Sequence, residues 1–195
     1  MKMSKFEKRF VNRRNKAEKN IMKVRDKLRQ IESENIKNAL EIGCGIGLVS
    51  SYLANEYGID VYGTDFDPEE IQLAKQLNNE RDTLHFKVED ATELSFANNS
   101  FDLVISQNVF HHIPYWQKAI SEFQRVLRPD GYLIWMDLVF PALLKKMFKS
   151  ITKNYGVYTL NDIHSEFYKA GFETVKKQKM VHGPFVHYEI VLTKI

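Results

Sequence analysis

Two short segments of this 195-residue chain contain residues that could take part in chemistry, and both follow apolar runs. The first is a glycine-rich turn, Gly43-Cys44-Gly45-Ile46-Gly47, and the second is the pair His111-His112. Glycine allows backbone conformations and a close approach to a ligand that a side chain forbids. Histidine has an unperturbed pKa of about 6.5, which suits a group that accepts a proton near neutral pH. The sequence therefore offers a ligand-binding turn and, further along, candidate proton acceptors.

The glycine-rich turn does not fit the common phosphate-binding patterns. A dinucleotide-binding turn has the pattern G-x-G-x-x-G. Counting from Gly43 places its third glycine at Leu48, and counting from Gly45 places it at Ser50. The Gly-Lys-Ser/Thr ending of a Walker loop is also missing from the turn. We therefore expect the turn to hold a ligand other than a pyrophosphate.

These residues need a scaffold, which the apolar pattern supplies from residue 37 onward. Strand-like and helical stretches alternate, with strands expected at 38–42, 60–64, 84–88, 101–106, 132–138, 172–181 and 185–194. The last two are close enough to form a hairpin. The pattern predicts an α/β fold: a Rossmann-like, doubly wound, seven-stranded sheet with helices on both faces and an antiparallel C-terminal hairpin strand. Ligands bind beyond the carboxyl ends of such strands, where the glycine-rich turn lies.

The first 33 residues differ from the rest of the chain in charge. Residues 1–30 contain twelve Lys and Arg but three Asp and Glu, a net charge of +9, whereas the remainder sums to −6. Apolar residues recur every three or four positions over 4–32, which predicts an extra, basic, amphipathic N-terminal helix (1–33) packed on domain 34–195. Its positive charge could bind nucleic acid, anionic lipid, an anionic substrate or the acidic remainder of the chain itself.

A second segment outside the alternating pattern, 139–159, follows the fifth expected strand. Its apolar residues recur at helical spacing among lysines: Leu143, Leu144, Met147, Phe148 and Ile151. We expect a lid over the substrate pocket, and the alternative is an amphipathic helix that seeks a membrane surface. Either structure favours an apolar or lipid-like acceptor, and the lysines favour an anionic one. Tyr115 and Trp116 could line the same cleft or pack in the core.

Five segments in order resemble the class I S-adenosylmethionine (SAM)-dependent methyltransferases, in particular their small-molecule branch. Glu41-x-Gly43-x-Gly45-x-Gly47 looks like the first motif of that family. The others follow at the spacing of the family: Asp65 after the second strand, Glu89-Asp90-Ala91 after the third, Phe101-Asp102-Leu103-Val104 in the fourth, and 127–133 before the fifth. The resemblance covers about residues 34–195 and implies that the chain binds SAM and releases S-adenosyl-L-homocysteine (SAH).

The resemblance assigns one group of residues to the methionine half of SAM. Gly43, Gly45 and Gly47 would let the backbone pass close to it, and Glu41 would hold its amine. Gln107, at the end of the fourth strand, would border the cofactor near the reacting methyl group.

A second group is assigned by the resemblance to the nucleoside half. Asp65 would accept hydrogen bonds from both ribose hydroxyls, which suits the two oxygens of a carboxylate. Asp90 and the Ala91 amide would bind the adenine edge, and Phe66 would lie against the adenine face.

SAM carries its own reactivity, so the protein has mainly to position the reactants. Positioning alone can supply on the order of 7–11 kcal/mol. A base is needed only where the acceptor loses a proton at about the moment of attack, and it then contributes roughly 10²–10⁴-fold. His111 and His112 are the candidates for that base. We expect no metal site, because these two residues are too few ligands.

The sequence as a whole favours a SAM-dependent methyltransferase with a small-molecule acceptor. Three alternatives stay open: an RNA or protein methyltransferase that uses the basic N-terminal segment, a lipid or quinone methyltransferase at the membrane surface, and a non-catalytic SAM-binding protein. Gln107-Asn108-Val109-Phe110 replaces the Asn-Pro-Pro-Tyr-type signature of enzymes that methylate base or amide nitrogens. Because no apolar run approaches roughly 18 residues and no secretory signal begins the chain, we expect a cytoplasmic location.

Overall fold

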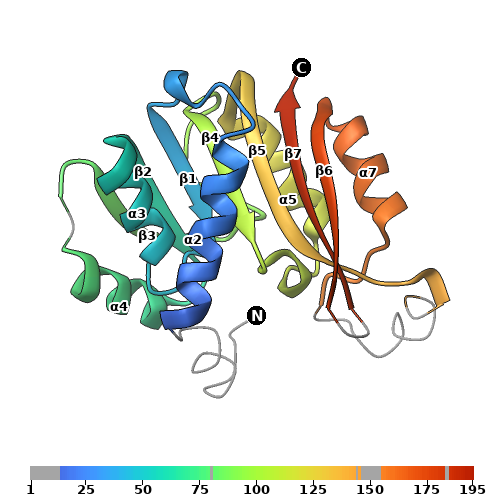
Figure 1. Ribbon diagram of the computed structural model, residues 1–195, viewed down its shortest axis with the longest axis horizontal. Helices are drawn as coiled ribbons and strands as arrows, with labels where there is room; N and C mark the ends of the chain where they lie inside the picture. Colours follow the sequence, from blue (N-terminus) through green and yellow to red (C-terminus); the bar gives the residue numbers. More distant parts are fainter. Residues whose placement is uncertain (1–13, 80, 144, 146–154, 183–184) are drawn as a thin grey trace.

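The computed structural model describes residues 14–79, 81–143, 145, 155–182 and 185–195 (Figure 1). Its strands are β1 (Asn38–Ile42), β2 (Asp60–Asp65), β3 (Leu84–Val88), β4 (Phe101–Gln107), β5 (Leu127–Val139), β6 (Phe172–His182) and β7 (Phe185–Lys194). They form one seven-stranded sheet in the order β3-β2-β1-β4-β5-β7-β6. The first five strands of this order pair in parallel, and β7 runs antiparallel to both β5 and β6. The expected doubly wound sheet with an antiparallel C-terminal hairpin strand is confirmed.

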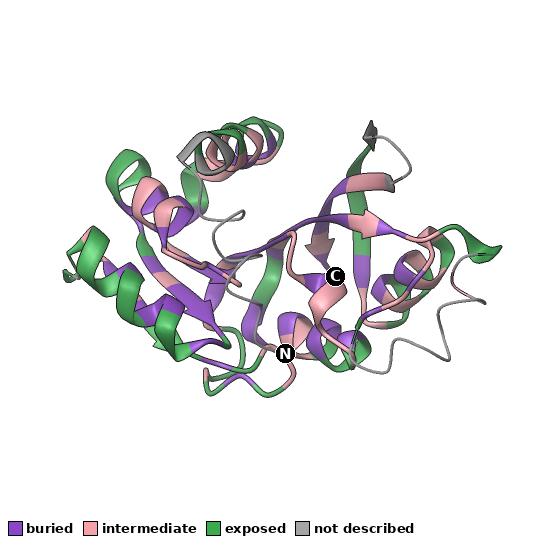
Figure 2. Ribbon diagram, turned by 90° about the horizontal axis from the view of Figure 1, so that it is seen from below, coloured by how far each residue is buried: buried purple, intermediate pink, exposed green. Residues whose placement is uncertain are grey.

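Helices cover both faces of the sheet. They are α2 (Arg14–Leu28), α3 (Leu48–Tyr57), α4 (Pro68–Asn78), α5 (Trp116–Val126) and α7 (Leu160–Lys169), with the short 3-10 helices η1 (Ser33–Asn35) and η2 (Phe110–His112). Successive side chains of a strand point to opposite faces, so each buried strand feeds two cores. Leu103 and Ile105 of β4 pack with residues of α2, α3 and α4, whereas Val104 packs with residues of α5 and α7. Figure 2 shows the buried sides of the helices turned toward the sheet.

The basic N-terminal segment packs on the domain over the part of it that the structure describes. Residues 1–13 lie outside the described residues, and α2 accounts for much of the rest of the expected helix. Val24 and Leu28 are buried, and Ile21 and Ile31 pack partly buried against the same core. The predicted apolar stripe is confirmed for these four residues. Residues 144 and 146–154 also lie outside the described part of the chain, so the expected lid stays a prediction.

Strand β5 starts earlier than expected. Its first residue is Leu127 rather than Tyr132, so Pro129, Asp130 and Gly131 lie within the strand. The register to β4 shifts between Phe101 and Leu103, and Asp130 has a φ of 61°. A β-bulge of this kind absorbs extra residues without ending the strand, which explains the difference.

The strand order places a switch point between β1 and β4. After β1 the chain builds outward through β2 and β3, and it then returns to the other side of β1 for β4 and β5. The loops after β1 and β4 therefore diverge and leave a crevice at the carboxyl edge of the sheet, which is where open α/β sheets bind ligands. Among the helices of the described residues, none combines the length and the apolar character needed to cross a membrane.

Candidate functional site

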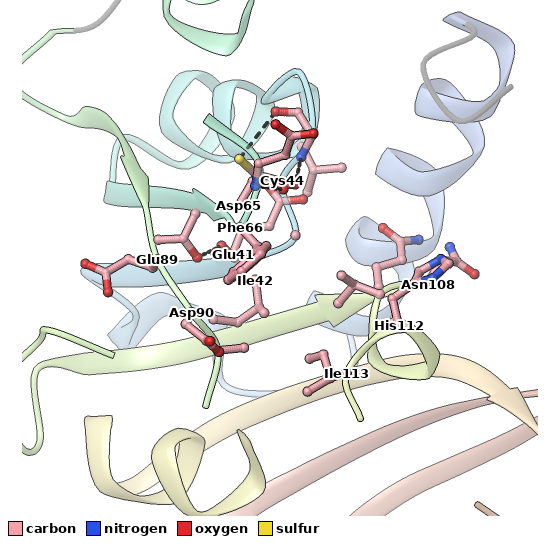
Figure 3. Close-up of a pocket in the computed structure, with 18 of the residues that line it drawn as sticks. Glu41, Ile42, Cys44, Asp65, Phe66, Glu89, Asp90, Asn108, His112 and Ile113 are labelled. Atoms are coloured by element: carbon pink, nitrogen blue, oxygen red, sulfur yellow. Dashed lines mark hydrogen bonds between the residues drawn. The ribbon is translucent and has the colours of Figure 1, made fainter. Parts of the chain in front are cut away.

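A cavity of about 340 Å³ lies at this switch point. Its walls come from α2 and from the segments that follow β1, β2, β3 and β4 (Figure 3). Nine of the residues that the sequence singled out line it: Glu41, Gly43, Gly45, Asp65, Phe66, Asp90, Ala91, Gln107 and His112. Residues far apart in the chain thus meet around one space of the size that holds a small ligand.

The glycine-rich turn has a left-handed backbone at each glycine. The φ angles of Gly43, Gly45 and Gly47 are 71°, 52° and 77°. A Cβ atom on Gly43 would stand 2.4 Å from Val109 Cγ2, so the turn packs directly on the loop after β4. Gly47 does not line the cavity; a Cβ there would stand 2.4 Å from the ring of Phe86. Packing against Phe86 and the left-handed backbone at the start of α3 both favour glycine at this position.

Asp65 holds the glycine-rich turn against the end of β2. Its carboxylate is buried and accepts hydrogen bonds from the backbone N–H groups of Gly45, at 3.0 Å, and Asp67, at 2.9 Å. Asp67 in turn caps α4 by accepting from the N–H of Glu69 at 3.1 Å. A carboxylate offers about four acceptor sites, so these bonds leave room for hydroxyl donors of a ligand.

Glu41 is a buried acid at the floor of the cavity. It receives a hydrogen bond from the hydroxyl of Ser50, a residue of α3. Burial raises the pKa of Glu41 from 4.5 to about 7, because a charged carboxylate loses its hydration there. A cation placed beside it would favour the ionised form.

The rim of the cavity carries an acid and an exposed aromatic ring. The Oδ1 atom of Asp90 accepts from the Thr92 N–H at 2.8 Å and from the Thr92 hydroxyl at 2.7 Å. Phe66 is 51% exposed although its side chain is large and apolar. The neighbouring Glu89 has a different role. Although burial opposes its ionisation, hydrogen bonds from Lys87 and Ser95 hold the pKa of Glu89 below its usual value.

Gln107 presents an unsatisfied amide to the cavity. Its side chain is 8% exposed, and neither Nε2 nor Oε1 has a hydrogen-bond partner among the described residues. Buried polar atoms are nearly always paired, and leaving one unpaired costs about 1–3 kcal/mol. A ligand that fills the cavity could supply the missing partner.

The two histidines occupy different positions. His112 lines the cavity, whereas His111 does not. The Nδ1 atom of His111 lies 2.6 Å from Oδ1 of the fully buried Asp137, whose Oδ2 accepts from the Phe110 N–H at 2.7 Å. The ring centroids of His111 and His112 are 4.1 Å apart. The structure thus separates a histidine that a ligand can touch from one that is held behind it by a buried carboxylate.

Several lining residues carried no clear signal in the sequence. They come from α2 and from the segment that follows β4: Asn20, Asn108, Val109, Ile113 and Pro114. Tyr115 lines the cavity at 68% exposure, whereas Trp116 is buried in the core, which decides between the two roles left open for them. Asn20 belongs to the N-terminal helix, and its place in the cavity wall follows from the packing of that helix on the domain. Within the described residues there is no group of three His, Cys, Asp or Glu side chains that could hold a metal ion.

Comparisons with known proteins agree with this architecture. The family model of a methyltransferase domain matches residues 40–135. A 2-methyl-6-phytyl-1,4-hydroquinone methyltransferase from Synechocystis is 39% identical over 98 residues, which are 50% of this chain and 31% of that protein. Phosphoethanolamine N-methyltransferase 2 from Caenorhabditis elegans is 32% identical over 146 residues, 72% of this chain and 33% of that protein. The chain therefore matches about a third of the length of these curated relatives.

A solved structure shows the same fold. Phosphoethanolamine N-methyltransferase 2 from Haemonchus contortus, in complex with phosphomonomethylethanolamine and SAH, superposes with a TM-score of 0.73 at 19% identity. The superposition covers 89% of this chain and 52% of that chain.

Proposed function

Because this chain carries a methyltransferase domain of the class I type, we propose that it transfers the methyl group of SAM to a small-molecule acceptor and releases SAH. The observation that carries the proposal is the switch-point cavity. In it a left-handed glycine turn, five acidic residues and the unsatisfied amide of Gln107 face one space. SAM combines an ammonium, a ribose diol and an adenine amine, and each of these groups donates hydrogen bonds that a carboxylate accepts.

The proposed placement of SAM follows the order of the strands. Glu41 and the turn at Gly43 and Gly45 hold the methionine half, where the ammonium keeps Glu41 ionised. Asp65 accepts from the ribose hydroxyls while it continues to hold the turn. Asp90, Ala91 and Phe66 hold the adenine at the rim. Gln107 borders the sulfonium, and Gly47 packs against Phe86.

The segment after β4 is proposed to face the acceptor. Val109, Ile113 and Pro114 make this wall apolar, and His112 adds an imidazole. An acceptor hydroxyl must lose its proton as it attacks, and the His112 imidazole on this wall can take it. The name of the Synechocystis relative contains a phytyl hydroquinone, which is apolar and carries ionisable hydroxyls. We propose such an acceptor for this chain.

The segments that flank the core complete this proposal. Residues 34–195 form the SAM-binding domain, α2 of the basic N-terminal segment caps it, and the lid expected over 139–159 stays a prediction. The two basic segments would attract an anionic acceptor or an anionic membrane surface, and nucleic acid is the less favoured partner.

Calorimetric titration of the full chain with SAM, SAH and NAD tests the cofactor. Micromolar binding of SAM and SAH without binding of NAD would support the proposal. A folded protein that binds neither SAM nor SAH would overturn it. Transfer of labelled methyl groups from SAM to phenolic, amine, lipid and RNA pools then identifies the acceptor class, and uptake by RNA alone would overturn the small-molecule assignment.

A further inference from the structure

A buried ion pair holds helix α2 against strand β7, in the C-terminal hairpin of the sheet. Lys27 is 3% exposed, and its Nζ atom lies 2.7 Å from Oε2 of Glu189 on β7, which is 4% exposed. The same Nζ atom donates to Oε1 of Gln178 on β6 at 2.9 Å. Lys23 adds a second ion pair to Glu189 at 2.9 Å. Removing one partner of a buried pair leaves an uncompensated charge, so this contact fixes the position of the helix strongly.

The fastened face of α2 is also the face that reaches the cavity. Asn20, Val24 and Lys27 are spaced four and three residues apart, which places them along one side of a helix. Val24 is fully buried in the core, and Asn20 lines the cavity. Figure 1 shows α2 lying across the sheet in front of β1 and β4. The ion pair therefore sets where the Asn20 amide stands in the cavity.

The charges around the cavity indicate what that amide could bind. The described lining contains five acids, namely Glu41, Asp65, Asp67, Glu89 and Asp90, and neither lysine nor arginine. The methionine half of SAM carries a carboxylate as well as an ammonium. The acids suit the ammonium, but the carboxylate needs N–H donors, which here must come from neutral groups.

Asn20 is a neutral side-chain donor that lines the cavity. Helix α2 packs on α3, the helix that begins directly after the glycine-rich turn, so Asn20 and that turn belong to neighbouring elements. We propose that the Nδ2 group of Asn20 donates a hydrogen bond to the carboxylate of the methionine half of SAM. Glu189, acting through Lys27, is the positioning residue for that contact. The proposal rests on the proposed function, because it needs SAM in this cavity.

The test compares SAM with decarboxylated SAM, which lacks only the carboxylate. Calorimetric titration is done on the full chain and on Asn20→Ala and Asn20→Asp. A hydrogen bond to a charged group predicts that Asn20→Ala weakens SAM about tenfold or more and leaves decarboxylated SAM unchanged. Asn20→Asp should weaken SAM further, because it places like charges together, and should not weaken decarboxylated SAM.

Each other outcome counts against the proposal. Equal weakening of both ligands by Asn20→Ala would mean that Asn20 shapes the cavity without contacting the carboxylate. Unchanged SAM affinity would mean that it contacts no part of SAM. If the unmodified chain binds neither ligand, the proposed function fails, and this inference fails with it.

The positioning role has its own readout. Glu189→Gln should weaken SAM and not decarboxylated SAM, and combining it with Asn20→Ala should be no worse than Asn20→Ala alone, because both changes remove one contact. Additive losses would overturn the positioning role. If Glu189→Gln does not fold, Lys27→Met with Glu189→Leu removes both charges at once and keeps the helix packed. That pair should retain the SAM affinity of the unmodified chain, and a loss would contradict positioning through α2.

Discussion

The two sides of the cavity differ in chemistry and in origin. One side, here called the acid side, consists of Glu41, Asp65, Phe66 and Asp90, and each of these residues lies at or just after the end of β1, β2 or β3. The opposite side, here called the η2 side, consists of the lining residues between β4 and α5: Asn108, Val109, His112, Ile113, Pro114 and Tyr115. Figure 3 shows Asp65 and Phe66 facing Asn108 and His112 across the space.

We infer from this difference that the two sides have different functions. The acid side offers acceptors for the many donors of one polar ligand, and the η2 side offers an apolar surface with a single imidazole. We expect changes on the acid side to act on cofactor affinity and changes on the η2 side to act on turnover. The predictions below test whether the two effects separate in this way.

The largest effect is expected on the η2 side. Replacing His112 with alanine removes the proton acceptor, so kcat for a hydroxyl acceptor should fall roughly 10²–10⁴-fold. The Kd for SAH should stay within about twofold, because His112 does not hold the cofactor. Single-turnover methyl transfer and calorimetry measure the two quantities. Equal losses in kcat and in SAH affinity would break the division between the sides.

On the acid side, Asp65→Ala should weaken SAH binding roughly ten- to a thousandfold, since each hydrogen bond to a charged group contributes about 1.5–3 kcal/mol. The structure adds a second consequence, because the N–H groups of Gly45 and Asp67 lose their acceptor. The free energy of unfolding should therefore also fall. Asp65→Asn keeps the size and one acceptor oxygen and should lose less on both counts. Unchanged SAH affinity in a folded Asp65→Ala variant would remove the ribose assignment.

A pH dependence should also come from the acid side. Because the pKa of Glu41 is about 7, this carboxyl is mostly protonated at pH 6 and mostly ionised at pH 8. An ammonium binds the ionised form, so SAH affinity should rise about tenfold from pH 6 to pH 8, with release of a proton on binding below pH 7. Glu41→Gln should flatten the dependence. Calorimetry in buffers of different ionisation enthalpy measures the proton release, and a flat profile in the unmodified chain would contradict the role of Glu41.

The smallest effect should follow from Phe66→Leu at the rim. Leucine keeps an apolar contact but loses the ring face, and aromatic pairing contributes about 0.5–1.5 kcal/mol beyond burial. SAH affinity should fall roughly two- to tenfold at constant kcat. Tyr168 is also exposed, but it lies on α7 and does not line the cavity, so Tyr168→Leu is the matched control. A Phe66→Leu variant that binds SAH as tightly as this control would remove the adenine assignment.

The acid side could be predicted residue by residue because its positions are local. A buried strand ends, a turn residue follows, and the carboxylate at that point must stand at the edge of the sheet. The family resemblance assigned Glu41, Asp65 and Asp90 to the ligand, and the structure places all three around one cavity. Gly47 was assigned to the same site, and the structure adds a constraint on it from the ring of Phe86, a residue 39 positions later.

The other walls could not be predicted, because they depend on contacts between distant parts of the chain. Asn20 lines the cavity because α2 packs on the domain, where Lys27 pairs with Glu189, 162 residues further along. The pair His111-His112 was visible in the sequence, but Asp137 decides which of them stands behind the other. No local pattern encodes such distances.

By itself, the sequence determined the order of strands and helices, the doubly wound sheet and the residues at its strand ends, because apolar periodicity and turn residues act over a few positions. Only the tertiary structure decided which glycines face the cavity, which histidine a ligand can touch and which residue of the basic N-terminal helix lines the cavity. Those outcomes depend on packing and on buried ion pairs between segments that the chain keeps far apart.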